Sequence, residues 1–127
     1  MALRAVAVAP PQAEVVLAKA VVRAATRLGL AQGELARVLG VSAASVSRLW
    51  SGGRALSPAT AEGRLALLFV RLFRSLDALL GGDEARSRAW LDAPNAHLAG
   101  RAPRELVATT EGLVHVADYL DAMRGGH

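Results

Sequence analysis

Cysteine is absent from this sequence of 127 residues, and aromatic residues make up only 4% of it. The missing thiols exclude disulfide bonds, thiol catalysis and thiolate metal sites, and they fit a protein of the reducing cytoplasm. The Ala/Val run before Pro10 is too short to cross a membrane and lacks a proper cleavage region. We therefore expect a cytoplasmic protein, with a signal peptide as the minor alternative.

Alanine and leucine dominate instead, and both favour helices. No segment alternates between polar and apolar residues as a half-buried strand would. The sequence therefore predicts an all-α protein. We expect a flexible arm over residues 1–13, a DNA-binding domain over residues 14–80 and a domain of small helices over residues 81–127, with Gly81-Gly82 as the break.

The segment from Leu30 to Arg54 predicts two short helices joined by a tight turn. Gly40 suits a left-handed helix end, Ser42 can cap the second helix, and Ala36 is small where the helices cross. The apolar residues have helical spacing on each side of the turn: Leu35 and Leu39 before it, Val46 and Leu49 after it. This pattern indicates a helix-turn-helix, whose second helix enters the DNA major groove. An ordinary αα-corner is the alternative.

Arg48 is the only long side chain that the motif places toward base edges, and it can bind guanine O6 and N7 together. Much of the affinity must then come from phosphate contacts. For Gln32, a solvent-exposed helix start is an equal alternative. The predicted DNA-binding residues are Gln32, Ser42, Ala43, Ala44, Ser45, Ser47, Arg48 and Arg54.

The net charge of +4 is unevenly distributed. Residues 1–80 carry ten basic and four acidic side chains, whereas residues 81–127 carry five and seven. A basic front half suits a polyanion, and an acidic rear half does not. Lys19, Arg23 and Arg27 form a stripe on the first helix, which either follows a phosphate backbone or is a solvated face.

The helices behind the motif have their own start signals. Ser57-Pro58 predicts the start of a long helix reaching Leu80, whose wide apolar face we expect to bridge the two halves and to contact a second copy. Asn95 predicts the cap of a short helix, and Thr110 the cap of the last one, from Glu111 to about Met123. Asp118 and Asp121 are expected on its solvated face.

The rear half shows no pattern that favours an enzyme. His97 and His115 lack partners at metal-ligand spacing, and they are more often surface or packing residues. Trp50 and Trp90 are most simply core residues. No strand precedes a glycine-rich phosphate loop. We expect no catalysis, metal or cofactor.

Residues Trp90 to Leu120 resemble the toxin-binding domain of the Xre/MbcA/ParS antitoxins, which carry an Xre-type helix-turn-helix in front. The matching positions are Trp90-Leu91, Pro94-Asn95, Leu98, Gly100, Pro103, Glu105-Leu106, Thr109, Gly112, Val116 and Leu120. The resemblance covers about Leu30 to the C-terminus. Ala99 departs from the pattern, since the family often has a second glycine there.

The resemblance implies a type II toxin–antitoxin role. Such antitoxins bind a RES-domain toxin that degrades NAD⁺, place their C-terminal region at its active-site entrance and repress their own operon. The toxin-binding residues implied here are Asn95, Gly100, Arg101, Glu111, His115, Asp118, Tyr119 and Arg124. We expect a homodimer that binds operator DNA. The main alternative is a free-standing Xre-like transcriptional regulator, and an enzyme is a distant third.

Overall fold

The computed structural model describes residues 11–125, which form seven α-helices and no strand beyond one isolated β-bridge. The prediction of an all-α fold is confirmed. No helix in this part of the chain combines the length and apolar character needed to cross a membrane. The elements are α1 (Pro11–Leu28), α2 (Gln32–Leu39), α3 (Ala43–Ser51), α4 (Ala61–Leu79), α5 (Glu84–Asp92), the 3-10 helix η2 (Ala96–Leu98), α6 (Pro103–Leu106) and α7 (Thr110–Met123).

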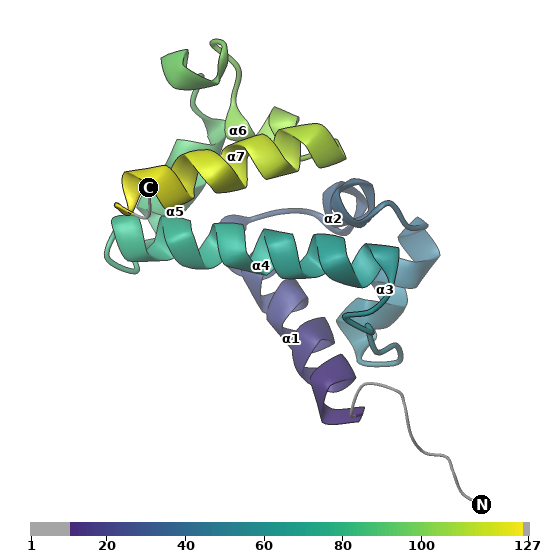
Figure 1. The fold of residues 1–127 in the computed structure, drawn as a ribbon. Coiled ribbons are helices and arrows are strands. Elements are labelled where there is room, and N and C mark those ends of the chain that lie inside the picture. Colours follow the sequence, from purple (N-terminus) through teal and green to yellow (C-terminus); the bar gives the residue numbers. More distant parts are fainter. Residues whose placement is uncertain (1–10, 126–127) are drawn as a thin grey trace, which may run out of the picture.

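Helix α4 lies at the centre of the fold and packs on α7, α1 and α2 (Figure 1). Its Phe69, Leu72 and Leu76 are almost fully buried, as are Leu113 and Leu120 of α7. The front and rear halves therefore share one apolar core. The expected bridging role of α4 is seen, and most of the apolar face that suggested a second copy is covered by the chain itself.

Two helix starts lie away from the predicted residues. The N-cap of α4 is Thr60, whose Oγ1 accepts the Gly63 N–H at 3.0 Å, whereas Ser57 Oγ accepts the Ala59 N–H in the preceding turn. The N-cap of α7 is Thr109. Both helices therefore begin at a threonine that differs from the predicted cap, by three residues in α4 and by one residue in α7. Residues 1–10 of the predicted arm lie outside the described residues, and α1 already begins at Pro11.

The starts of α4 and α7 repeat one local structure. Gly63 follows its capping threonine by three residues, as Gly112 does in α7, and each glycine donates its N–H to that threonine. A Cβ at Gly63 would lie 1.8 Å from the Ser57 carbonyl oxygen, and one at Gly112 would lie 1.9 Å from that of Leu106. Only glycine lets the preceding loop pass this close to the helix.

The turn of the helix-turn-helix has the predicted geometry. Gly40 adopts φ 69° and ψ 35°, and its N–H contacts the carbonyls that end α2. Ser42 Oγ accepts the Ser45 N–H at 3.1 Å and so caps α3. A Cβ at Gly40 would meet no atom within 4 Å, which leaves backbone conformation as the only demand for glycine there.

Gly40→Val is therefore expected to lower the free energy of unfolding by about 1–2 kcal/mol, the cost of a left-handed β-branched residue. Thermal or urea unfolding measures this change, with DNA binding as a second readout that should weaken. Gly40→Asn is the matched control, because asparagine tolerates this region better than valine. Equal stability of the Val variant and the wild type would contradict a strained turn.

Candidate functional site

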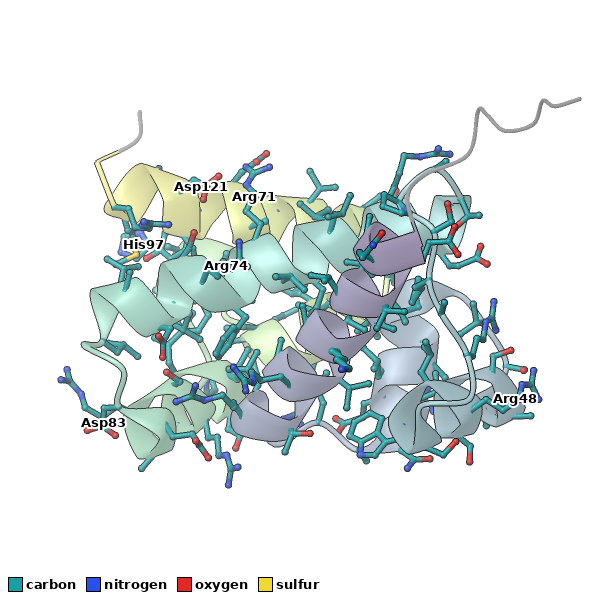
Figure 2. All side chains as sticks on the ribbon, turned by 90° about the horizontal axis from the view of Figure 1, so that it is seen from below. Arg48, Arg71, Arg74, Asp83, His97 and Asp121 are labelled. Carbon is teal, nitrogen blue, oxygen red and sulfur yellow. The ribbon has the colours of Figure 1, made fainter. Side chains whose placement is uncertain are left out.

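Helix α3 presents a small polar surface on a firmly packed base. Val46 is fully buried and Leu49 is nearly so, while Ala43, Ala44 and Ser47 are exposed. Because the apolar side faces the core, the exposed side is fixed in orientation. Figure 2 shows Arg48 at one end of the molecule, away from the other labelled residues.

Two of the predicted DNA-binding serines are engaged within the motif. Ser45 is only 8% exposed, and its hydroxyl accepts from Ser42 Oγ at 3.0 Å and from Arg48 Nη2 at 3.4 Å. Ser45 is therefore buried on the same helix side as Val46 and Leu49, which does not suit the direct DNA contact predicted for it. Ser42 serves as the cap. Ser45 instead steadies the guanidinium of Arg48.

The two predicted phosphate contacts at the motif's edges differ. Gln32 is exposed at the start of α2. Arg54 is 29% exposed, and its Nη2 lies 3.2 Å from Glu62 Oε2. Its charge is thus partly neutralised inside the protein, which makes it a weaker phosphate ligand than a free arginine.

The basic stripe on α1 borders the C-terminal end of α3. Lys19 and Arg23 are exposed and line a groove of roughly 580 Å³, together with Trp50 and the segment that follows it. Arg27 instead lies 3.5 Å from Glu84 and over the Phe73 ring. The stripe therefore divides into two exposed cations near the helix-turn-helix and one arginine held by the rear half.

The segment between α5 and α6 forms a small closed loop. The Asn95 N–H donates to the Arg101 carbonyl at 3.1 Å, the Gly100 N–H donates back to the Asn95 carbonyl at 2.9 Å, and Leu98 is buried. As predicted, Asn95 caps the short helix, here through the His97 N–H. In Figure 1 this segment, in green at the top, projects beyond α6 and α7.

The loop's curvature also explains the departure at residue 99. Ala99 adopts φ 59° and Gly100 φ 74°, both in the left-handed region that favours glycine. A second glycine at this position therefore relieves backbone strain.

Three rings from separate elements stack beside this loop. Tyr119 of α7 lies 6.4 Å from Trp90 and 5.9 Å from His97, measured between ring centroids. His97 is exposed and Trp90 is half-buried, so the interpretation of Trp90 as a plain core residue is incomplete. The spacing of these residues in the sequence gave no signal of the stack, since it joins positions 22 and 29 apart from Tyr119.

The acidic residues of α7 are not equivalent. Asp121 accepts from Arg71 Nε at 2.9 Å, from Arg71 Nη2 and from Ser75 Oγ at 2.9 Å. Hydrogen bonds from Arg71, then from Ser75, lower the pKa of Asp121. The expectation of a freely solvated Asp121 is therefore wrong, because it joins α7 to α4 (Figure 2). Asp118 is 68% exposed and lies 3.7 Å from Arg71.

The remaining predicted toxin-binding residues lie on the surface of the same half. Glu111 and His115 are exposed, with no side-chain partner in the described part of the chain. Arg101 is exposed and lies 3.7 Å from Glu105. Arg124 donates to Ser75 Oγ at 3.2 Å. Across residues 11–125, His, Asp and Glu side chains form no group of three that could hold a metal ion.

Sequence reasoning missed the residues that join the two halves. Arg88 of α5 donates to the carbonyls of Arg27 and Thr26, and Arg104 of α6 reaches Glu34 of α2 at 3.0 Å. These contacts span 61 to 70 residues of sequence, and neither arginine lies in a local pattern that marks it.

Comparison with known proteins gives a match for each half of the chain. The model of the antitoxin Xre-like helix-turn-helix domain matches residues 7–71, and that of the antitoxin Xre/MbcA/ParS C-terminal toxin-binding domain matches residues 75–126. A chain in the crystal structure of the M. tuberculosis MbcT-MbcA toxin–antitoxin complex is similar with a TM-score of 0.64 and 29% sequence identity, over 87% of this chain and 96% of that chain. No curated protein matches. The two matched stretches meet within α4.

Proposed function

This chain belongs to the Xre/MbcA/ParS antitoxins with an Xre-like helix-turn-helix domain, and from that membership we propose that it neutralises a RES-domain toxin and represses its own operon. The toxin would degrade NAD⁺, and the antitoxin would act in the cytoplasm by covering the entrance to the toxin's active site. The chain itself would contribute no catalysis.

One observation carries the proposal. Helix α3 and the projecting loop of the rear half pack on a single apolar core, yet Arg48 and His97 lie at opposite ends of the molecule in Figure 2. This separation leaves room for DNA at one end and a toxin at the other. A protein that engages both partners together fits neutralisation combined with repression.

The residues of the rear half that we propose as toxin contacts differ in how the fold presents them. Arg101, Glu111, His115 and Asp118 are exposed side chains that a toxin can reach, and Tyr119 presents its ring through the aromatic stack. Asn95 and Gly100 act by shaping the loop. Arg124 lies beside Ser75 and would contact a toxin only at the edge of this surface.

On the front surface, we propose direct contacts from Ala43, Ala44, Ser47, Arg48 and Gln32, with Arg54 as a weaker phosphate contact. Ser42 and Ser45 act indirectly, through the cap and through Arg48. Because only one long side chain reaches the bases, a homodimer reading two half-sites would supply the remaining specificity. Most of the apolar face of α4 is covered, so the dimer rests on this symmetry argument.

Co-expression tests the proposal. A RES-domain toxin encoded beside this protein should co-purify with it, and cellular NAD⁺ should fall when the toxin is expressed alone and recover when both are expressed. The alternative, a free-standing transcriptional regulator, predicts DNA binding without co-purification and no recovery of NAD⁺. Operator binding alone therefore does not separate the two functions, whereas NAD⁺ recovery does.

Arg48→Ala is expected to weaken operator binding by roughly 1–3 kcal/mol, because it removes a paired contact to a base edge. Titration of promoter DNA and of a mixed-sequence duplex measures the effect, which should be smaller on the second. Arg37→Ala, which removes an exposed arginine from α2, is the charge-matched control. An equal loss on both duplexes would make Arg48 a phosphate contact instead.

A further inference from the structure

One cluster of polar contacts between the two halves is centred on Arg104 of α6. Its Nη1 lies 3.0 Å from both carboxylate oxygens of Glu34, and its Nε lies 2.6 Å from Asp92 Oδ1. The Arg104 side chain is only 25% exposed. A rear-half arginine is thus held against the first turn of the first motif helix.

Glu34 occupies a sensitive position in that helix. Glu34 lies two residues after Gln32, the first residue of α2, and its Oε1 accepts the Ala31 N–H at 2.8 Å. Free N–H groups at a helix start are suited to bind phosphate, and helix-turn-helix proteins place backbone contacts there. A carboxylate beside them repels the same phosphate unless a cation neutralises it.

The Glu34 carboxylate remains ionised in this environment. Burial by itself would raise its pKa, but hydrogen bonds from the Ala31 N–H and from Arg104 together lower it below the usual value. The negative charge therefore persists at the proposed phosphate contact, and only Arg104 forms an ion pair with it in the described part of the chain.

We infer that Arg104 is a positioning residue of the DNA-binding surface: although it also pairs with Asp92, it offsets the charge of Glu34 and so supports the proposed phosphate contact at the start of α2 from the toxin-binding half. This inference rests on the proposed DNA binding and names a contribution of the rear half to it. The affinity for DNA then depends on how the two halves are docked.

The surrounding contacts keep this arrangement in place. Arg104 also approaches the Leu28 and Gly29 carbonyls, each at 3.4 Å, and Arg88 donates to the Arg27 and Thr26 carbonyls at 3.0 and 3.1 Å. The carbonyl end of α1 carries partial negative charge, so two guanidinium groups stabilise it. The end of α1 and the start of α2 are thereby fixed to α5 and α6.

Four full-length proteins test the inference: the wild type, Arg104→Gln, Glu34→Gln and the double variant. Each is titrated against a promoter duplex from upstream of its own gene and a mixed-sequence duplex of the same length. Arg104→Gln should weaken binding to both duplexes by about threefold to tenfold at low salt, because Glu34 is left unneutralised. Glu34→Gln should strengthen binding, since glutamine can still accept the Ala31 N–H while Arg104 stays positive.

The double variant should return close to wild-type affinity. This reversal separates a charge effect from simple damage to the fold. Damage to the fold would weaken DNA binding in both single variants, and the two losses would add up in the double variant. Arg86→Gln is the matched control: it removes one positive charge from an exposed side chain of α5 that forms no ion pair in the described part of the chain, and it should change affinity little.

Four outcomes would count against these proposals. Unchanged affinity in Arg104→Gln, or an Arg86→Gln loss of equal size, would overturn the inference while leaving repression intact. Weaker binding in both single variants and in the double would reduce Arg104 to a purely structural contact. A wild-type protein that binds neither duplex would overturn the proposed repression, and the inference with it.

Discussion

Gly112→Ala is expected to lower the free energy of unfolding by roughly 2–4 kcal/mol, a large part of the stability of a small domain. The added Cβ would lie 1.9 Å from the Leu106 carbonyl oxygen and 2.7 Å from its carbon. Since both are backbone atoms, no flexible side chain can move aside. The helix start or the loop must shift, which breaks the 3.1 Å hydrogen bond from Gly112 to Thr109.

Urea unfolding measures the change, and Gly33→Ala is the matched control. Gly33 also lies in the first turn of a helix, but a Cβ there meets no atom within 4 Å. Alanine at this position should therefore raise stability by about 0.5–1 kcal/mol. Similar stability changes in the two variants would contradict a special constraint at Gly112. Gly63→Ala should resemble Gly112→Ala, because the start of α4 has the same geometry.

The front half was predictable because its determinants are local. Gly40 and Ser42 stand within three residues of each other. Gly40 adopts the left-handed backbone that ends α2, and Ser42 caps α3 by accepting a backbone N–H three residues further on. Helical periodicity then indicates which side faces the core. Ser45 is the exception in the motif, because it was predicted to contact DNA although its helical spacing from Leu49 places it on the inner side of α3.

The contacts between the halves were not predictable in the same way. Arg104 and Glu34 are 70 residues apart, and Arg71 and Asp121 are 50 apart. Each of these residues looks like an ordinary surface charge in the sequence. Their pairing depends on how α4, α6 and α7 pack, which charge counts and periodicity do not determine.

Part of the proposed toxin-binding surface could be predicted only from the family resemblance. The resemblance indicated that Tyr119 matters, but its stacking with Trp90 and His97 required the loop after α5 to turn back over α7. That turn depends on Ala99 and Gly100 in the left-handed region. The sequence alone placed His97 as an isolated histidine, and its place in the stack comes from the fold.

The structure also determines how toxin binding should be tested. Helix α7 contributes Leu113, Val116 and Leu120 to the core, so deleting it would unfold the chain and report nothing about the toxin. Charge reversal at Asp121 would break its contacts with Arg71 and Ser75. A surface test must avoid both and use acidic residues of α7 that face solvent.

Glu111→Lys combined with Asp118→Lys is expected to weaken toxin binding by about tenfold to a hundredfold. An enzyme that takes NAD⁺ must accommodate its negatively charged phosphates, so we expect positive charge around the entrance that this helix would cover. Two acidic residues turned basic would then meet like charge, which is costly across an interface. Both side chains are exposed, and folding should change little.

Glu14→Lys combined with Asp77→Lys is the matched control. It changes the net charge by the same amount as the α7 variant, but the changes lie on α1 and α4. Toxin affinity, operator affinity and melting temperature should be measured on the same preparations. Only the α7 pair should reduce toxin binding, while DNA binding in both variants should hold or rise slightly with the added positive charge. Equal toxin binding by the α7 variant and the wild type would remove this face of α7 from the proposed interface. The loop around Asn95 and Arg101 would then have to supply the contact by itself.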